Sequence, residues 1–173
     1  MVFIVSGGVG EGKTAFFGRV ASLLRRRGAA LAGFRSERVY RGEELVGYDL
    51  VGLGSRTRAP WLRKDGAGER IGPYAVVPAG LAAAEATIAG SPPSGLLAVD
   101  ELGPAELGGR GFWPALSPLL QSESRSFLFV VRTGCLAGFK RLFAGRSLAI
   151  FRVGGAWSPA DAAREILARV RQG

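Results

Sequence analysis

Eight residues near the start of the chain have the types and spacing needed to bind phosphate groups. The segment Gly7-Gly8-Val9-Gly10-Glu11-Gly12-Lys13-Thr14 fits the P-loop pattern G-x-x-x-x-G-K-[ST]. In such a loop, backbone N–H groups converge on phosphate oxygens, and the following helix N-terminus adds partial positive charge. Lys13 would reach the β- and γ-phosphates, and the Thr14 hydroxyl would ligate Mg²⁺. We therefore expect Gly7 through Ala15 to bind a nucleoside triphosphate.

The residues on either side of this segment have the pattern that such a loop requires. Val2–Val5 is a short apolar run, as expected for a buried strand. After the loop, Ala15–Arg27 has helical character, and its apolar residues are spaced to cover one face: Phe16, Phe17, Val20, Leu23 and Leu24. A strand, a glycine-rich loop and a helix in this order place backbone amides around a phosphate group.

An acid pair at the end of another apolar run is the second feature with chemical potential. Leu96–Val99 is typical of a buried parallel strand, and Asp100 and Glu101 follow it directly. In P-loop proteins a strand of this form delivers an Asp to the Mg²⁺ shell, which makes Asp100 the second predicted metal ligand beside Thr14. Glu101 is the candidate to accept a proton from, or to orient, an attacking water. Lys13 and Glu101 are the predicted catalytic residues.

The segment between the two motifs is longer than a minimal P-loop domain needs. Two β-rich runs, 35–40 and 45–51, flank a polar turn and predict a hairpin. Residues 52–70 are rich in Gly and Arg, with Pro60 and Trp61 in the middle. This composition predicts a long loop, and loops of this length are often functional lids.

The remaining apolar runs complete a three-layer α/β fold. Strands of the main sheet are predicted near residues 2–5, 30–34, 96–100, 127–131 and 148–153. A further short strand is predicted at 74–77, a helix at about 80–89, and a last helix that begins at Ser158 or Asp161. Strands alternating with helices predict a mainly parallel sheet covered on both faces. We expect residues 1–173 to form a single P-loop domain with the hairpin and lid inserted at about 35–78.

Composition narrows the function classes. The chain of 173 residues is 47% hydrophobic and 21% charged, which is typical of a globular protein. No apolar run approaches the roughly 18 residues of a membrane span. A single cysteine, Cys135, excludes an internal disulfide, and the absence of histidine excludes His-based acid–base schemes. A cytoplasmic protein without membrane contact is the expectation, and a monomer is favoured.

The chain is strongly basic, with a net charge of +9 from 23 Lys+Arg against 14 Asp+Glu. A cationic surface collects phosphates, so a nucleic-acid partner stays open. The basic residues are nearly all Arg and are dispersed, apart from Arg25-Arg26-Arg27 at the end of the first helix. There they complement the helix dipole, which favours a structural role over a nucleic-acid patch.

Several further segments resemble one known family. The chain resembles the small P-loop nucleoside-triphosphatase family of archaea, bacteria and animals that includes the cancer-related nucleoside-triphosphatase. The segments that carry the resemblance, in the family's order, are Gly33–Val39, Val46–Leu50, Ile71–Tyr74 and Asp100–Leu107, with Phe112 at the expected distance. The match runs through about the first two-thirds of the chain. It implies Mg²⁺-dependent hydrolysis of the terminal phosphate of ATP, GTP or other nucleoside triphosphates.

The last third departs from the family's pattern. Family members commonly carry a His at the end of the strand near 127–131, where this chain has Arg132. The family's Asn-Arg pair before the last helix is replaced by Gly154–Trp157. Arg132 is either a cation for the γ-phosphate or a surface residue at a strand end. Glu37 either approaches the site or pairs within the hairpin, and Glu106 is expected to brace the Asp100 loop.

Two other functions remain open at the level of sequence. A P-loop kinase of a nucleoside or nucleotide would use the same loop and a carboxylate to deprotonate an acceptor hydroxyl. Its acceptor would lie under an arginine-rich lid, with Arg56, Arg58, Arg63 and Arg70. A nucleotide-switched module that binds RNA or protein would instead show partner-dependent turnover and salt-sensitive binding. The nucleobase preference is not encoded in the phosphate loop.

Overall fold

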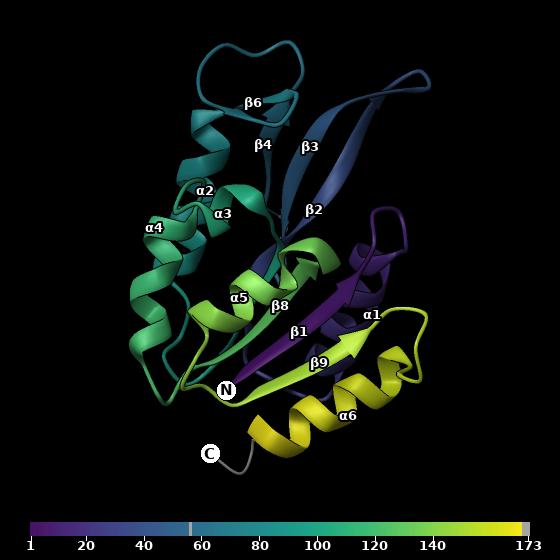
Figure 1. The fold of residues 1–173 in the computed structure, drawn as a ribbon, viewed down its shortest axis with the longest axis vertical. Helices are drawn as coiled ribbons and strands as arrows, with labels where there is room; N and C mark the ends of the chain where they lie inside the picture. The colour runs from purple at the N-terminus through teal and green to yellow at the C-terminus, as the bar shows by residue number, and fades with distance from the viewer. Residues whose placement is uncertain (56, 171–173) are drawn as a thin grey trace.

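The computed structural model describes residues 1–55 and 57–170, so Arg56 of the expected arginine-rich lid lies outside the described residues. Within these ranges the strands form one sheet of nine in the order β5-β6-β4-β3-β2-β7-β8-β1-β9 (Figure 1). The strands are β1 (Val2–Gly7), β2 (Leu31–Arg41), β3 (Glu44–Gly52), β4 (Arg58–Arg63), β5 (Arg70–Ile71), β6 (Tyr74–Val76), β7 (Leu96–Leu102), β8 (Ser126–Arg132) and β9 (Leu148–Arg152).

The half of the sheet that contains the two motifs is parallel. β1 lies between β8 and β9, β7 pairs with β8, and the first part of β2 pairs with β7, all in parallel register. The carboxyl ends of these strands therefore meet along one edge, which is where ligands bind in open α/β sheets. This arrangement confirms the predicted mainly parallel sheet and brings the P-loop beside the end of β7.

Helices cover both faces of the sheet and explain why its strands are apolar throughout. Consecutive residues of β1 alternate between two hydrophobic layers, with Phe3 and Val5 in one and Val2 and Ile4 in the other. The first layer packs against α1 (Lys13–Arg26) and α6 (Pro159–Val170). The second packs against elements from the middle of the chain: α2 (Pro78–Ala89), α4 (Trp113–Leu116), the 3₁₀ helices η1 (Ser117–Gln121) and η2 (Thr133–Cys135), and α5 (Leu136–Leu142). The short helix α3 (Pro104–Leu107) follows β7.

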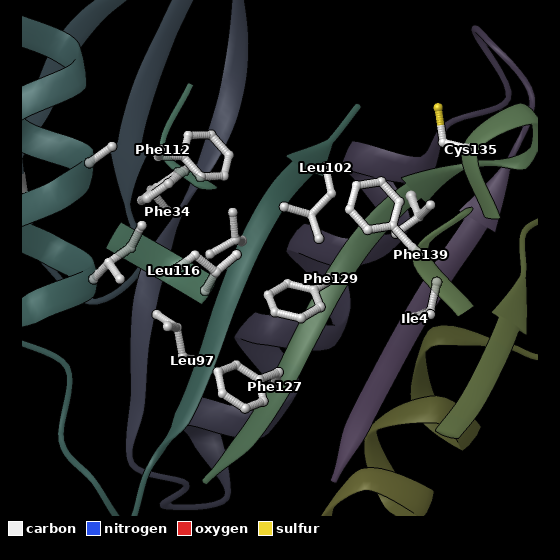
Figure 2. Packing of buried hydrophobic residues seen from close by; sticks show 14 of the residues in the cluster. Ile4, Phe34, Leu97, Leu102, Phe112, Leu116, Phe127, Phe129, Cys135 and Phe139 are labelled. Atoms are coloured by element: carbon white, nitrogen blue, oxygen red, sulfur yellow. The ribbon is translucent and has the colours of Figure 1, made fainter. Parts of the chain in front are cut away.

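Aromatic rings fill much of the second layer (Figure 2). Phe127 and Phe129 of β8 stack with centroids 5.4 Å apart, and Phe129 stacks in turn on Phe143 at 5.5 Å. Phe112 packs edge-on against Phe34 of β2 at 5.3 Å. These contacts join β2, β8 and the helices into one buried unit and so fix the strand ends that carry the candidate site. Among the described helices, none is long and apolar enough to cross a membrane.

The expected hairpin is present, but the prediction of a long loop over residues 52–70 is wrong, because a strand lies within them. β2 continues beyond the parallel sheet and pairs with β3 in antiparallel register (Figure 1). Within residues 52–70, β4 pairs with β3 on one side and with β6 on the other. Pro60 argued against a strand because proline cannot donate to the ladder. The structure accommodates it opposite Asp49, beside a bulge at which Trp61 is the extra residue.

Gly33 permits the close approach of β2 to β7, and its replacement is expected to destabilise the fold. Its φ is +128°, and a Cβ at this position would lie 1.7 Å from the Ala98 carbonyl oxygen. Gly33→Ala should therefore lower the free energy of unfolding by about 3 kcal/mol or more, measured by urea unfolding. Gly134→Ala is the matched control, because nothing lies within 4 Å of the added Cβ. Equal stability of the two variants would contradict this explanation.

Candidate functional site

The P-loop connects β1 to α1 at the carboxyl edge of the parallel strands. Gly10 and Gly12 have φ values of +80° and +82°, a left-handed conformation that glycine adopts without a steric cost. α1 begins at Lys13, which is one residue after the second of these glycines. The Lys13 side chain is buried, and its Nζ donates a hydrogen bond to the Gly8 carbonyl at 2.7 Å. The ammonium group thus lies over the loop.

Glu11 adds a carboxylate to the same loop. Its Oε2 accepts a hydrogen bond from the Gly8 N–H at 2.6 Å, although the residue is exposed. If Gly7 or Gly8 carried a side chain, its Cβ would lie only 3.0 Å or 2.8 Å from this carboxylate, respectively. One amide of the loop is therefore already paired with an anion that belongs to the chain itself.

Asp100 lies in β7, two residues before the strand ends, and is almost fully buried. Both carboxylate oxygens have no partner with hydrogen-bond geometry in the part of the chain that the structure describes. Burial raises the pKa of Asp100 to about 7, and the neighbouring Glu101 charge acts in the same direction. The Thr14 hydroxyl, the Ser36 amide and Lys13 lie close enough to oppose this rise in pKa. A buried carboxylate without a partner is costly, which is typical of a site built for a ligand.

The oxygen atoms of Asp100 and Thr14 are of the kind that can ligate a magnesium ion. No cluster of three or more Asp, Glu, His or Cys residues suited to a metal occurs within 1–55 and 57–170. Mg²⁺ does not require one, because it is usually bound by one or two carboxylates together with waters and substrate phosphates. The unpaired Asp100 carboxylate and the Thr14 hydroxyl next to it are oxygen ligands of the right kind.

Glu101 is held by an arginine from the neighbouring strand. Arg132, the last residue of β8, donates from its Nε to Glu101 Oε1 in an ion pair. The side chain of Glu101 is 22% exposed, so its carboxylate faces the solvent-accessible edge while Asp100 does not. Arg132 is therefore more than a surface residue at a strand end, because it fixes one oxygen of the candidate base.

Glu106 braces the turn after β7, as the sequence suggested. The residue is buried, and its Oε2 accepts a hydrogen bond from the Gly103 N–H at 3.0 Å. Burial raises the pKa of Glu106, while the amides of Gly103 and of Glu106 itself lower it. This contact fixes the backbone two residues after Glu101. Glu106 thus positions the loop rather than presenting its carboxylate to solvent.

Charged side chains of β2, β3 and β4 form a ladder beside α1. The Glu37 carboxylate pairs with Arg35 and Arg58, and Asp49 accepts from Arg58 at 2.9 Å and from Arg63 at 2.5 Å. Glu37 is therefore paired both within β2 and with β4, and it also lines the cavity described below. The ladder also fixes Arg35, whose guanidinium lies near Gly18 of α1. Sequence reasoning missed Arg35, although the period of two along β2 places it on the α1 side.

The ion pairs of the ladder make the contribution of Asp49 to folding stability depend on pH. Burial alone would raise its pKa, but hydrogen bonds from Arg63 and Arg58 hold the pKa of Asp49 below its ordinary value. A lowered folded-state pKa stabilises the fold above the unfolded value of about 3.9, and this contribution is lost as the pH falls through the folded-state pKa. Asp49→Asn should cost about 1–3 kcal/mol at pH 7 and progressively less below about pH 4 in urea unfolding. Asp65→Asn, which removes an exposed ion pair, is the control. If Asp49→Asn lowered the free energy of unfolding by the same amount at every pH, the role of the ladder would be contradicted.

One cavity of about 1390 Å³ brings most of the predicted residues together. Of the P-loop, Val9, Gly10, Gly12, Lys13, Thr14 and Ala15 line it, as does Glu101. Gly7, Gly8 and Glu11 are not among its lining residues, and Asp100 lies buried beneath it. Residues that the sequence did not propose as site residues line it too, notably Arg19, Arg38 and Tyr48.

Comparison with known proteins identifies similar chains. A family model described as NTPase matches residues 2–153. A nucleoside-triphosphatase THEP1 of Hyperthermus butylicus is 32% identical over 131 residues, covering 74% of this chain and 69% of that protein. The nucleoside-triphosphatase THEP1 of Thermofilum pendens is 33% identical over 125 residues, covering 70% of this chain and 68% of that protein.

Two solved structures have a similar fold. The solution structure of a human cancer-related nucleoside triphosphatase matches with a TM-score of 0.72 and 21% identity, covering 99% of this chain and 97% of that one. The crystal structure of THEP1 from Aquifex aeolicus matches with a TM-score of 0.72 and 18% identity, covering 98% and 99%. At identities of 21% and 18%, these two comparisons show a shared fold and nothing more.

Proposed function

Because this chain belongs to the NTPase family and is a hydrolase of nucleoside triphosphates, we propose that it removes the terminal phosphate in a Mg²⁺-dependent reaction. The observation that carries this proposal is the buried, unpaired Asp100 carboxylate next to Thr14 at the mouth of the P-loop. The substrates that we propose are ATP, GTP and other nucleoside triphosphates, since a phosphate loop does not read the base.

The residues of the loop bind and orient the triphosphate. Backbone amides of residues 7–15 and the N-terminus of α1 hold the phosphate oxygens, and Lys13 approaches the β- and γ-phosphates. Thr14 and Asp100 would hold Mg²⁺, which, when bound, neutralises charge on these phosphates. Ser158 and Pro159, at the start of α6, line the same cavity and are placed to contact the nucleoside.

Glu101 is the proposed base for the attacking water. As the water oxygen bonds to the γ-phosphorus, the bond from that phosphorus to the bridging oxygen breaks, and the diphosphate leaves with the electron pair. Glu101 orients this water and accepts its proton. Arg132 holds Oε1 of Glu101, a residue that lines the cavity, so Oε2 is the oxygen proposed to take the proton. Most of the catalysis would come from positioning and charge stabilisation.

The proposal is tested by phosphate release from ATP, GTP, CTP and UTP, each with Mg²⁺ and with EDTA. We expect the wild type to release phosphate from several nucleotides only with Mg²⁺, and Asp100→Asn to require much higher Mg²⁺ concentrations. Asp65→Asn is the matched control, because Asp65 is an exposed residue of the β4–β5 connection. Equal Mg²⁺ dependence of Asp100→Asn and wild type would overturn the assigned metal ligand.

Glu11 is expected to weaken nucleotide binding. Its carboxylate lies on the loop that receives the phosphates, so like charges approach when the nucleotide binds. Glu11→Gln keeps a hydrogen-bond acceptor but removes the charge, and should tighten the Kd for a fluorescent ATP analogue about fivefold, equivalent to about 1 kcal/mol. Glu43→Gln, in the hairpin turn, should leave the Kd unchanged. An unchanged or weaker Kd for Glu11→Gln would show that this charge does not oppose the phosphates.

A further inference from the structure

The side chains of β2 that line the cavity alternate between its two sides, which we call its first and second compartments. Arg35 and Glu37 lie on the side of α1, where the P-loop and the start of α6 provide the other walls. Arg38 points to the opposite side, and it is paired across the hairpin with Tyr48. Glu101 and Arg132 line the cavity as an ion pair, and the Arg132 charge lies close enough to Tyr48 to affect its hydroxyl. The second compartment therefore meets the first at the proposed base.

Aromatic rings form one wall of this second compartment. Tyr48 of β3 and Tyr74 of β6 pack edge-on with centroids 5.3 Å apart, and both line the cavity. Trp61, Ile71 and Pro73 extend the same wall. Flat rings of this kind accept a planar group of a ligand by stacking. The antiparallel strands β3, β4 and β6 build the wall, and hydrolysis by water alone does not use it.

Cations surround the aromatic wall. Arg38 is exposed; its guanidinium donates to the Tyr40 hydroxyl at 3.5 Å and also lies near the Tyr48 hydroxyl. The Arg110 guanidinium makes long contacts with the other described residues, to Glu69 at 3.4 Å and to the Arg70 carbonyl at 3.5 Å. Burial raises the pKa of Tyr48, and the charges of Arg38 and Arg132 oppose it, which shows that both guanidinium groups lie near its ring. The compartment thus offers weakly satisfied guanidinium groups to an anion.

The size of the cavity also exceeds what one small ligand needs. At about 1390 Å³ it is larger than the roughly 300–1,000 Å³ of common ligand pockets. A nucleoside triphosphate on the P-loop would occupy the α1 side. The compartment around Tyr48, Tyr74, Arg38 and Arg110 would remain open to a second molecule, with its entrance at Glu101.

We propose that this second compartment, called below the acceptor compartment, binds a small ring-bearing anionic alcohol, to which the protein transfers the γ-phosphoryl group. The ring stacks on Tyr48 and Tyr74, the anionic group pairs with Arg38 and Arg110, and the hydroxyl approaches Glu101. Its oxygen bonds to the γ-phosphorus, the bond to the bridging oxygen breaks, and the nucleoside diphosphate leaves with the electron pair. Glu101 takes the hydroxyl proton. This step rests on the proposed function, because it uses the same loop and base.

The test separates transfer from hydrolysis by measuring two products. The protein is incubated with γ-labelled ATP, Mg²⁺ and each nucleoside 3′-monophosphate, which carries a flat base, a phosphate and a free 5′-hydroxyl. We expect ADP to exceed inorganic phosphate, and the difference to equal the labelled acceptor. If ADP equals phosphate with every acceptor while hydrolysis continues, the acceptor compartment is wrong and the proposed function stands. If ATP is not consumed under any condition, both proposals are wrong.

Variants then assign transfer to the compartment. Arg38→Ala should lower the yield of labelled acceptor about tenfold, as expected for one lost charge-assisted contact, with phosphate release in the absence of acceptor within about twofold of wild type. Arg41→Ala is the matched control, because Arg41 lies on the same strand and pairs with the exposed Asp65. Transfer that is equally efficient in Arg38→Ala and Arg41→Ala would overturn the proposed compartment.

Discussion

Replacing Lys13 with alanine is expected to abolish nucleotide hydrolysis, with kcat/KM falling at least about a thousandfold. The ammonium group is buried against the P-loop, and its present partner is the Gly8 carbonyl at 2.7 Å. A bound triphosphate would offer it phosphate oxygens instead, at the point where negative charge accumulates in the transition state. Alanine removes this charge without replacing it. Phosphate release under saturating Mg²⁺ measures the loss.

The control for this prediction separates the role in catalysis from loss of fold. Lys140→Ala removes an exposed lysine from α5, at the last turn of a helix outside the cavity. We expect it to retain wild-type turnover. Both variants should unfold at urea concentrations close to that of wild type, because one side chain-to-carbonyl hydrogen bond contributes only about 1 kcal/mol. A folded Lys13→Ala protein that still hydrolyses ATP at near the wild-type rate would refute the assignment of the loop.

The parts of the site that the sequence predicted are those whose residues are contiguous. The P-loop between β1 and α1, and Asp100 near the end of β7, each depend on a short segment with a strand at its boundary. The parallel register of β1, β7 and β8 then places the segments side by side without further information. The boundaries moved only slightly, with α1 beginning at Lys13 rather than Ala15.

The parts that the sequence did not predict depend on pairing between distant residues. Arg132 and Glu101 are 31 positions apart and meet because β7 and β8 are neighbours. Arg58, which was expected in a lid, lies in β4 and joins Glu37 to Asp49. β4 itself was missed because Pro60 is unfavourable in a strand, and the bulge that accommodates it is set by the partner strand. These contacts depend on which strands pair and in which register, and the local sequence pattern does not encode that pairing.

Glu101→Gln is expected to lower kcat by about a hundredfold to ten-thousandfold, while nucleotide affinity stays within about threefold of wild type. Glutamine has the shape of glutamate and can still accept a hydrogen bond from Arg132, but it cannot accept the proton of the attacking water. The loss should therefore appear in kcat rather than in binding. Single-turnover phosphate release and equilibrium binding of a fluorescent ATP analogue measure the two quantities separately. Glu165→Gln, on α6 and outside the cavity that contains the P-loop, is the surface control.

A comparison of Arg132→Ala with Glu101→Gln distinguishes two roles of Glu101: the base that acts on water, or only the ion-pair partner of Arg132. If Glu101 were needed solely to hold Arg132, removing either residue would have the same effect, and Arg132→Ala would lower kcat as far as Glu101→Gln. We expect a smaller loss for Arg132→Ala, because the carboxylate remains and loses only the contact that orients it. The double variant should be no slower than Glu101→Gln alone, since orientation is without value once the base is gone. Equal losses in the two single variants would instead assign the catalytic charge to Arg132.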